Sequence, residues 1–173
     1  LHREQFNIND IIEDVVQGYR NQIQVQNKVG SDTEILFTPK DDINLVEADK
    51  GRLAQVISNL LDNSLKFTKP TRGKGKIHII SEKKDNQVTV SIMDTGIGID
   101  PEIFPKLFSR FASKSFSGTG LGLFISKSII EEHGGKVWAQ NNPNGGGATF
   151  SFTIPSSQQH LGLDDSGGDY NEK

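Results

Sequence analysis

The apolar residues of this chain change their spacing several times, and these changes of period constrain the fold more than any other feature. Helical spacing predicts three sizeable helices, at about residues 8–24, 49–65 and 120–133, with Asn7 and Asp49 as N-caps. Short extended runs predict about six strands, two of them forming a hairpin within residues 76–93. Pro101 to Phe108 is expected to form a short helix with proline in its first position.

No strict alternation of strand, helix and strand runs along the chain, which disfavours a doubly wound parallel fold. We predict an α/β two-layer sandwich, with a mixed, mostly antiparallel sheet and helices on one face. A chain of 173 residues is long enough for one domain without disulfides or structural metals. We expect that domain over residues 6–155 and a disordered acidic tail over residues 156–173.

The composition excludes several classes of function. The chain has no cysteine, which rules out disulfide frameworks, thiolate zinc sites, cysteine nucleophiles and iron–sulfur clusters. The net charge is −3, and the predicted tail alone accounts for it, so the body is neutral. A neutral body has no global field to attract nucleic acid, and any anion site must be local. The chain has no apolar run of transmembrane length and no signal peptide, so we expect a soluble, cytoplasmic domain.

Glycine is concentrated in one part of the chain, since ten of the 18 glycines lie between residues 96 and 147. One cluster, Asp94-Thr95-Gly96-Ile97-Gly98, ends a predicted strand. A carboxylate there can accept a hydrogen bond from the exocyclic amine of a purine, and glycines allow close approach of the ring. The alternative is a simple turn at the end of a strand.

A second cluster, Gly118-Thr119-Gly120-Leu121-Gly122, opens the last predicted helix. Free amides and the positive dipole end of a helix N-terminus bind anions such as polyphosphate. The spacing is that of neither a Walker A loop nor a Rossmann loop, and a flexible turn is the alternative. The other five glycines are predicted to be architectural: Gly134 and Gly135 after a helix, and Gly145, Gly146 and Gly147 between strands.

The second predicted helix carries a polar stripe on one side. Two carboxamides four residues apart, followed by a lysine, suit a ligand-facing surface: amide oxygens can join the oxygen shell of magnesium, and an ammonium can approach a phosphate. An ordinary solvent-facing side of an amphipathic helix is the alternative. Between the glycine clusters, a run of aromatic residues predicts a short helix packed on the core, followed by two cations that can counter phosphate charge. The stripe is Gln55, Asn59, Asp62, Asn63 and Lys66, and the cations are Arg110 and Lys114.

Taken together and in order, these segments resemble the ATP-binding catalytic domain of sensor histidine kinases, in the superfamily that also contains gyrase, MutL proteins and a heat-shock chaperone. Asn59 to Thr68 resembles the N box, Asp94 to Gly98 the first glycine box, Phe104 to Phe111 the F box and Gly118 to Gly122 the second glycine box. The resemblance extends from about Phe6 to Pro155 and implies the Bergerat-type ATP-binding fold.

The resemblance implies a site for ATP and Mg²⁺ and transfer of the γ-phosphoryl group to a histidine nitrogen. Asn63 would coordinate magnesium, Asp94 would bind the adenine amino group, and residues 112–119 would form a lid. Asn59, Lys66 and Arg110 would act at the phosphates as the catalytic residues. The full nucleotide-binding set implied is Asn59, Asn63, Lys66, Asp94, Gly96, Gly98, Ile99, Arg110, Lys114, Gly118, Thr119, Gly120, Leu121 and Gly122.

Two departures from related patterns refine this expectation. Gyrase-like ATPases carry a glutamate where this chain has Asn59, and a neutral carboxamide cannot serve as a base, so little intrinsic ATP hydrolysis is expected. The chain also lacks a histidine-containing H box, so the acceptor histidine would lie on a separate dimerisation domain. Residues 1–5 are interpreted as the last helical turn of that domain or as a linker.

The implied partners are the dimerisation domain and a response regulator receiver domain. A homodimer is expected only in the full-length parent, and a monomer for this chain; whether the parent is membrane-anchored is left open. Two other functions are weighed: a serine kinase of the anti-sigma-factor type, and a non-catalytic binding module gated by nucleotide.

Overall fold

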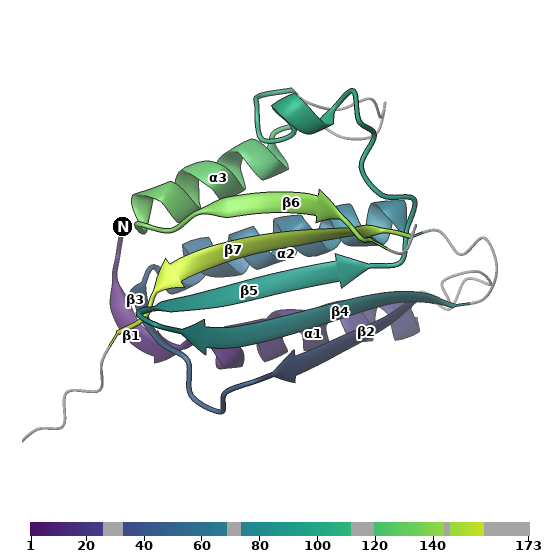
Figure 1. The fold of residues 1–173 in the computed structure, drawn as a ribbon. Helices are drawn as coiled ribbons and strands as arrows, with labels where there is room; N and C mark the ends of the chain where they lie inside the picture. Colours follow the sequence, from purple (N-terminus) through teal and green to yellow (C-terminus); the bar gives the residue numbers. More distant parts are fainter. Residues whose placement is uncertain (26–32, 69–73, 112–119, 144–145, 158–173) are drawn as a thin grey trace, which may run out of the picture.

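The computed structural model describes residues 1–25, 33–68, 74–111, 120–143 and 146–157. A five-stranded sheet forms one layer and three helices cover one of its faces (Figure 1). Its strand order is β2 (Thr33–Pro39), β4 (Gly75–Lys84), β5 (Gln87–Asp94), β7 (Ala148–Pro155) and β6 (Val137–Asn141). Only β2 and β4 pair in parallel, so the predicted mixed, mostly antiparallel two-layer fold is confirmed.

The helices are α1 (Ile8–Val25), α2 (Lys50–Phe67) and α3 (Gly122–Glu132). The two predicted N-caps are present: the side chain of Asp49 accepts from the Arg52 amide at 3.1 Å, and that of Asn7 accepts from the Asn9 amide at 3.2 Å. Gly134, with φ +77°, follows α3 and ends it as predicted. No helix in the described part of the chain is long and apolar enough to span a bilayer.

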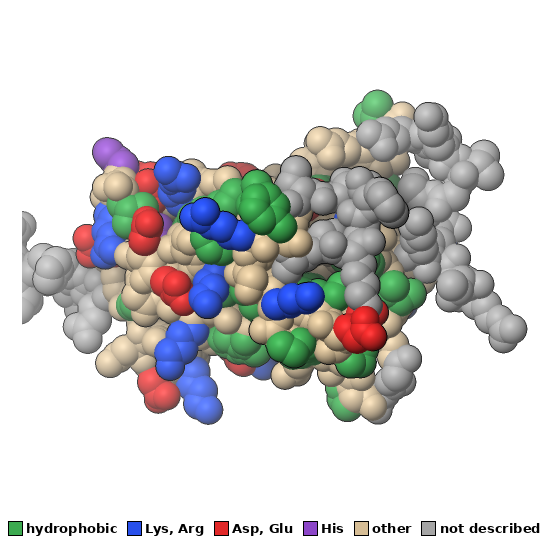
Figure 2. Space-filling view, turned by 90° about the horizontal axis from the view of Figure 1, so that it is seen from above, with side chains coloured by type: hydrophobic (Ala, Val, Ile, Leu, Met, Phe, Trp, Pro, Cys, Tyr) green, Lys and Arg blue, Asp and Glu red, His purple; other side chains and the backbone are tan. Residues whose placement is uncertain are grey.

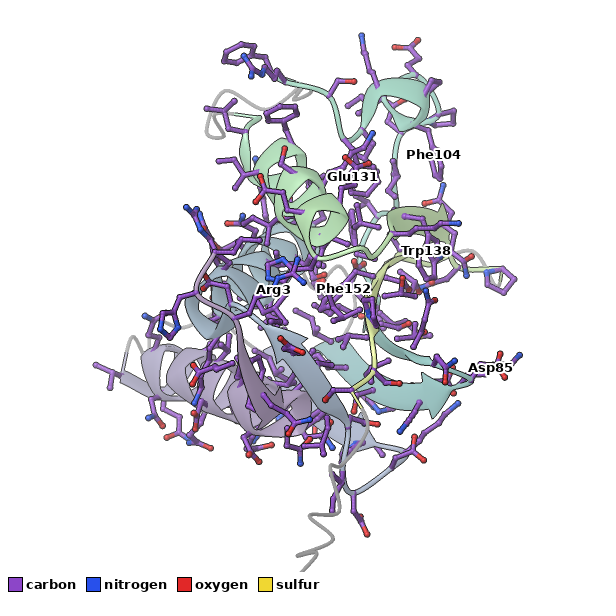
Figure 3. The ribbon with its side chains drawn as sticks, turned by 90° about the vertical axis from the view of Figure 1, so that its left-hand side faces the viewer. Arg3, Asp85, Phe104, Glu131, Trp138 and Phe152 are labelled. Atoms are coloured by element: carbon purple, nitrogen blue, oxygen red, sulfur yellow. The ribbon has the colours of Figure 1, made fainter. Side chains whose placement is uncertain are left out.

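The hydrophobic core lies between the sheet and the helices. Figure 3 shows Phe152 of β7 in this interior, whereas Asp85 lies at the tip of the β4–β5 turn. Each large aliphatic or aromatic side chain buried there stabilises the fold by roughly 1.5–3 kcal/mol. The helix side of the core contains Ile8, Ile11, Ile12 and Val16 of α1, Leu53, Val56, Ile57, Leu60 and Leu61 of α2, and Ile129 and Ile130 of α3.

His133 joins the ends of two helices beneath the sheet. It is buried, its Nε2 accepts from the backbone amide of Asp49 at 3.0 Å, and its Nδ1 lies 2.7 Å from the carbonyl of Ile129. Because an amide can only donate, Nε2 must be the unprotonated nitrogen, and Nδ1 must carry the proton that the carbonyl accepts. The neutral imidazole therefore fixes the C-terminus of α3 against the N-cap of α2.

The prediction of a short helix from Pro101 to Phe108 is wrong. This segment consists of turns and a single 3₁₀ turn, η1 (Phe104–Lys106). Pro105 explains the difference, because a proline inside an α-helix lacks the amide donor and its ring clashes with the carbonyl four residues earlier.

Two expectations about the ends of the chain also change. Glu4 and Gln5 were expected in a helical turn or linker, but they lie in β1 (Glu4–Asn7), which pairs antiparallel with β3 (Leu45–Ala48). Ser156 and Ser157 were predicted to belong to the tail, but they are part of the fold. The amide of Ser156 donates to the Asn86 carbonyl at 2.8 Å, and the amide of Ser157 donates to the Leu45 carbonyl at 2.9 Å. The rest of the predicted tail, 158–173, lies outside the described residues.

Candidate functional site

The polar stripe of α2 meets the beginning of α3 through the side chain of Asn59. Its Nδ2 donates to the carbonyl of Gly122 and to the hydroxyl of Ser126, both at 3.2 Å. The Nδ2 of Asn63 donates to the carbonyl of Asn59 at 2.9 Å. These bonds orient both carboxamides by their nitrogens, and no donor among the described residues reaches either side-chain oxygen. Two amide oxygens are therefore available for a ligand or cation at the α2–α3 junction.

The other three residues of the stripe, Gln55, Asp62 and Lys66, differ in their contacts. Asp62 accepts a hydrogen bond from the hydroxyl of Tyr19 on α1 at 2.6 Å, and burial together with this bond raises the pKa of Tyr19. Asp62 thus fastens α1 to α2. Lys66 lies in the last turn of α2 with its Nζ 5.5 Å from the centre of the Phe67 ring, and Gln55 is exposed. One residue of the stripe is therefore structural, and the ligand-facing role of Asn59 and Asn63 stays a prediction.

Asp94, at the end of β5, is a buried carboxylate with only 2% of its surface exposed. Its Oδ1 accepts from the amides of Gly96 at 2.9 Å and Ala148 at 3.1 Å, while its Oδ2 receives no backbone amide of the described residues. Burial raises the pKa of Asp94, and the hydrogen bonds from these two amides oppose the rise. Ser64 is fully buried beside the carboxylate, although its hydroxyl does not reach full hydrogen-bond geometry with any described atom.

The loop after Asp94 passes very close to the end of α2. A Cβ on Gly96 would lie 2.3 Å from the carbonyl oxygen of Phe67, and the amide of Ile97 donates to the same oxygen at 3.3 Å. Gly98 has φ +78°, a conformation that favours glycine. The loop therefore depends on glycine at both positions.

Sequence reasoning missed the groups that reach Asp94 from the β6–β7 connection. Gly147, predicted to be architectural, packs directly on Asp94: a Cβ on it would lie 1.9 Å from the Asp94 carbonyl oxygen, and its φ is +82°. Asn142 donates to the same carbonyl at 2.9 Å. These contacts join segments 48 or more residues apart in sequence, so no local pattern announces them. The run of three glycines was the one available signal.

Gly147→Ala is expected to destabilise the domain by at least about 1–3 kcal/mol, because the new Cβ meets backbone and the left-handed φ is strained for alanine. Thermal unfolding of the nucleotide-free domain measures the loss. Gly146→Ala is the matched control, since a Cβ there meets nothing within 4 Å. Equal stability of the two variants would contradict the close packing of Gly147 on Asp94.

The second glycine cluster is described only from Gly120 onward. Gly120 has φ +66° and its carbonyl accepts from the amide of Phe111 at 3.1 Å, and Leu121 and Gly122 begin α3. The Arg110 guanidinium lies 4.7 Å from the centre of the Phe124 ring, near the start of α3. Lys114, Gly118, Thr119 and the predicted lid over 112–119 lie outside the described residues.

The charges around the molecule support a local rather than a global anion site. In Figure 2, Lys and Arg side chains alternate with Asp and Glu on the face seen, with no continuous field of one sign. Within the described ranges, no cluster of three or more histidine, aspartate or glutamate side chains is arranged to hold a metal ion. A cation at the α2–α3 junction would therefore need oxygens from its ligand as well as the two amides.

Comparison with known proteins assigns the chain and its fold to a family. The family of "Histidine kinase-, DNA gyrase B-, and HSP90-like ATPase" domains matches residues 48–158. The sensor protein FixL of Bradyrhizobium diazoefficiens is 35% identical over 127 residues, which make up 73% of this chain and 25% of FixL. The sensor protein KdpD of Clostridium acetobutylicum is 40% identical over 152 residues, 84% of this chain and 16% of KdpD.

Solved structures agree with this assignment. The catalytic domain of histidine kinase ThkA, in a nucleotide-free form, matches with a TM-score of 0.78 and 36% identity, covering 90% of this chain and 96% of that domain. ThkA in complex with the response regulator TrrA matches with a TM-score of 0.71 and 34% identity, covering 90% of this chain and 42% of ThkA.

The chain belongs to the family of histidine kinase-, gyrase B- and HSP90-like ATPases. It spans only a quarter or less of the length of FixL and KdpD. Within the family it is the catalytic ATPase domain of a two-component sensor histidine kinase, as the resemblance of its motifs predicted. ATP binding follows from membership of this family.

Proposed function

We propose that this chain transfers the γ-phosphoryl group of Mg-ATP to a histidine on a separate dimerisation domain, for onward transfer to a response regulator receiver domain. One observation carries the proposal: three groups of complementary chemistry lie around α2. The first is the buried carboxylate of Asp94, beside the C-terminal turn of α2. The second is the pair of amide oxygens of Asn59 and Asn63, which accept no hydrogen bond from a described residue. The third is the start of α3, which is bonded to Asn59. They suit, in order, an adenine amine, a metal and a polyphosphate.

The amide oxygens of α2 fit a magnesium ion that is also held by phosphate oxygens. Asn63 is proposed as its ligand, because its nitrogen already donates to the Asn59 carbonyl and no described residue donates to its oxygen. Magnesium, when bound, neutralises charge that develops on the phosphates during transfer. The first amides of α3, preceded by Gly118, Thr119, Gly120 and Leu121, are proposed to hold the phosphates, with Lys66, Arg110 and Lys114 supplying positive charge.

Asn59 separates the proposed reaction from ATP hydrolysis. Its carboxamide is bonded to Gly122 and Ser126 and has no basic atom, so it cannot remove a proton from an attacking water. The nucleophile is then the imidazole of the partner domain, and the site of this chain positions and neutralises the phosphoryl group. The proposal places the domain in the cytoplasm, where ATP is supplied, as a monomer when isolated and a homodimer in its parent protein.

The decisive experiment mixes this chain with a separately produced acceptor domain, Mg²⁺ and γ-labelled ATP. Acid-labile, alkali-stable label on that domain is the expected result. Label on a serine of a small partner protein would indicate the anti-sigma-factor type of kinase instead. ATP binding without any transfer would favour a nucleotide-gated binding module and would contradict the proposal. ThkA in complex with response regulator TrrA supports a receiver domain as the second partner to test.

A further inference from the structure

Two consecutive asparagines at the end of β6 hold the two ends of the loop that follows Asp94. The Oδ1 of Asn141 accepts from the amide of Ile99 at 2.7 Å, and its Nδ2 donates to the Ile99 carbonyl at 3.0 Å. The Nδ2 of Asn142 donates to the carbonyl of Asp94 at 2.9 Å. Asn141 and Asn142 are neighbours in the chain, and they bind Ile99 and Asp94 at the two ends of the loop. The distance between these two ends is therefore fixed by the backbone at the end of β6.

The contact between Asn141 and Ile99 needs a carboxamide. A primary amide presents a donor and an acceptor side by side, which matches the N–H and C=O of one backbone residue, whereas a carboxylate has no donor. Gly98 is adapted to the same contact: its φ is +78°, and a Cβ on it would lie 2.9 Å from the Oδ1 of Asn141. The glycine and the asparagine therefore fit together as a pair.

The two hydrogen bonds between Asn141 and Ile99 form a clamp on the loop, and this clamp belongs to the sheet that carries Asp94. Asn141 is opposite Ala148 in the β6–β7 register, and the amide of Ala148 is one of the two that bind the Asp94 carboxylate. The hydroxyl of Thr149 donates to the Oδ1 of Asn142 at 2.6 Å and so fixes its orientation. Asn141 itself is exposed, so it is not needed to fill the core, and its side chain contacts the loop rather than the interior.

We propose that Asn141 is a positioning residue for the adenine subsite, holding the loop from Asp94 to Ile99 in the form that receives the purine. The inference rests on the proposed ATP site and assigns the site a residue outside the four motifs. Without the clamp the loop must be ordered by the nucleotide itself, and that ordering reduces affinity. The loss concerns the adenine end alone, so it is the same for ATP and ADP and is independent of magnesium.

The test measures the Kd of the folded domain for ATP and ADP, with Mg²⁺ and with EDTA. Asn141→Ala is expected to raise every Kd by the same factor, about tenfold, since two hydrogen bonds of modest net strength are lost. Asn141→Gln, which keeps the carboxamide, is expected to recover part of the affinity. Gln140→Ala is the matched control, because Gln140 is the preceding exposed residue of β6.

Three outcomes would overturn the inference: wild-type Kd values for Asn141→Ala, a loss seen only with Mg²⁺, or an equal loss in Gln140→Ala. If Asn141→Ala does not fold, a folded Asn141→Asp variant, which loses the donor to the Ile99 carbonyl, also overturns it when its affinity is unchanged from wild type, and supports it when its affinity is reduced. Failure of the wild-type domain to bind any nucleotide contradicts the proposed function instead, so the two failures are distinguishable.

Discussion

Replacing Asp94 by asparagine is expected to lower the affinity for ATP by about 10–100-fold, the range for loss of a hydrogen bond to a charged group. The new amide keeps an oxygen that can accept from the amides of Gly96 and Ala148, but it presents a donor where the adenine amine also donates. Titration calorimetry with ATP and GTP measures the change. Retained preference for ATP over GTP would contradict the adenine role of Asp94.

The same substitution is expected to leave the nucleotide-free domain as stable as the wild type, or more stable, at neutral pH. Burial raises the pKa of Asp94 above its unfolded value, so the folded state binds this proton more tightly than the unfolded state. Ionisation at Asp94 therefore costs stability above the folded-state pKa, and the cost disappears as pH falls below the unfolded pKa. The difference in melting temperature between Asp94→Asn and wild type should shrink from pH 7 toward acid.

ATP affinity of the wild type should fall over the same pH range, because the ionised carboxylate is a stronger acceptor for the adenine amine than the protonated acid. Asp85→Asn provides the matched control: Asp85 is an exposed turn residue with φ 54°, a conformation that asparagine tolerates (Figure 3). It should change neither the melting temperature nor ATP binding. A pH dependence shared by both variants would assign the effect to other groups.

Asn63→Ala is the second variant with a large expected effect, and it should remove the dependence of ATP binding on magnesium. Loss of a metal-binding group is expected to weaken Mg-ATP binding by on the order of 10–100-fold or more, while binding in EDTA changes little. The fold should tolerate the change, because Asn63 is only partly buried and its side chain donates to a carbonyl of its own helix.

Gln55→Ala is the control for Asn63→Ala, since it removes another carboxamide from the same helix at an exposed position. The Kd with Mg²⁺ and with EDTA should be unchanged in this control. If Asn63→Ala binds Mg-ATP like wild type, the amide oxygens of α2 do not serve the metal, and the stripe is only a partly covered solvent face.

The parts of the fold that sequence predicted are those where local periodicity and local capping coincide. The helices beginning after Asn7 and Asp49 and the β4–β5 hairpin are of this kind. The four residues of β1 carry no alternating apolar pattern and become a strand through pairing with β3, about 40 residues later. That pairing is tertiary, so nothing in the local sequence indicates it.

The candidate site divides in the same way. Asn59, Asn63, Asp94 and the glycines were found because their spacing forms motifs, and two of those motifs meet at the Asn59–Gly122 bond. Asn141, Asn142 and Gly147 lie in a polar, glycine-rich connection that is locally indistinguishable from an ordinary loop. They join the candidate site through proximity in space alone, since they contact residues more than 40 positions away in sequence.

The Ala148 amide and the Gly96 amide meet on one oxygen of Asp94 although they belong to segments 52 positions apart. An unfolded chain cannot bring such groups together, so it has no comparable affinity for nucleotide, and ligand binding becomes part of the folding equilibrium. Nucleotide at 100 times its Kd would add about 2.7 kcal/mol to the free energy of unfolding by mass action. The stability of this domain would then rise with the concentration of ATP around it.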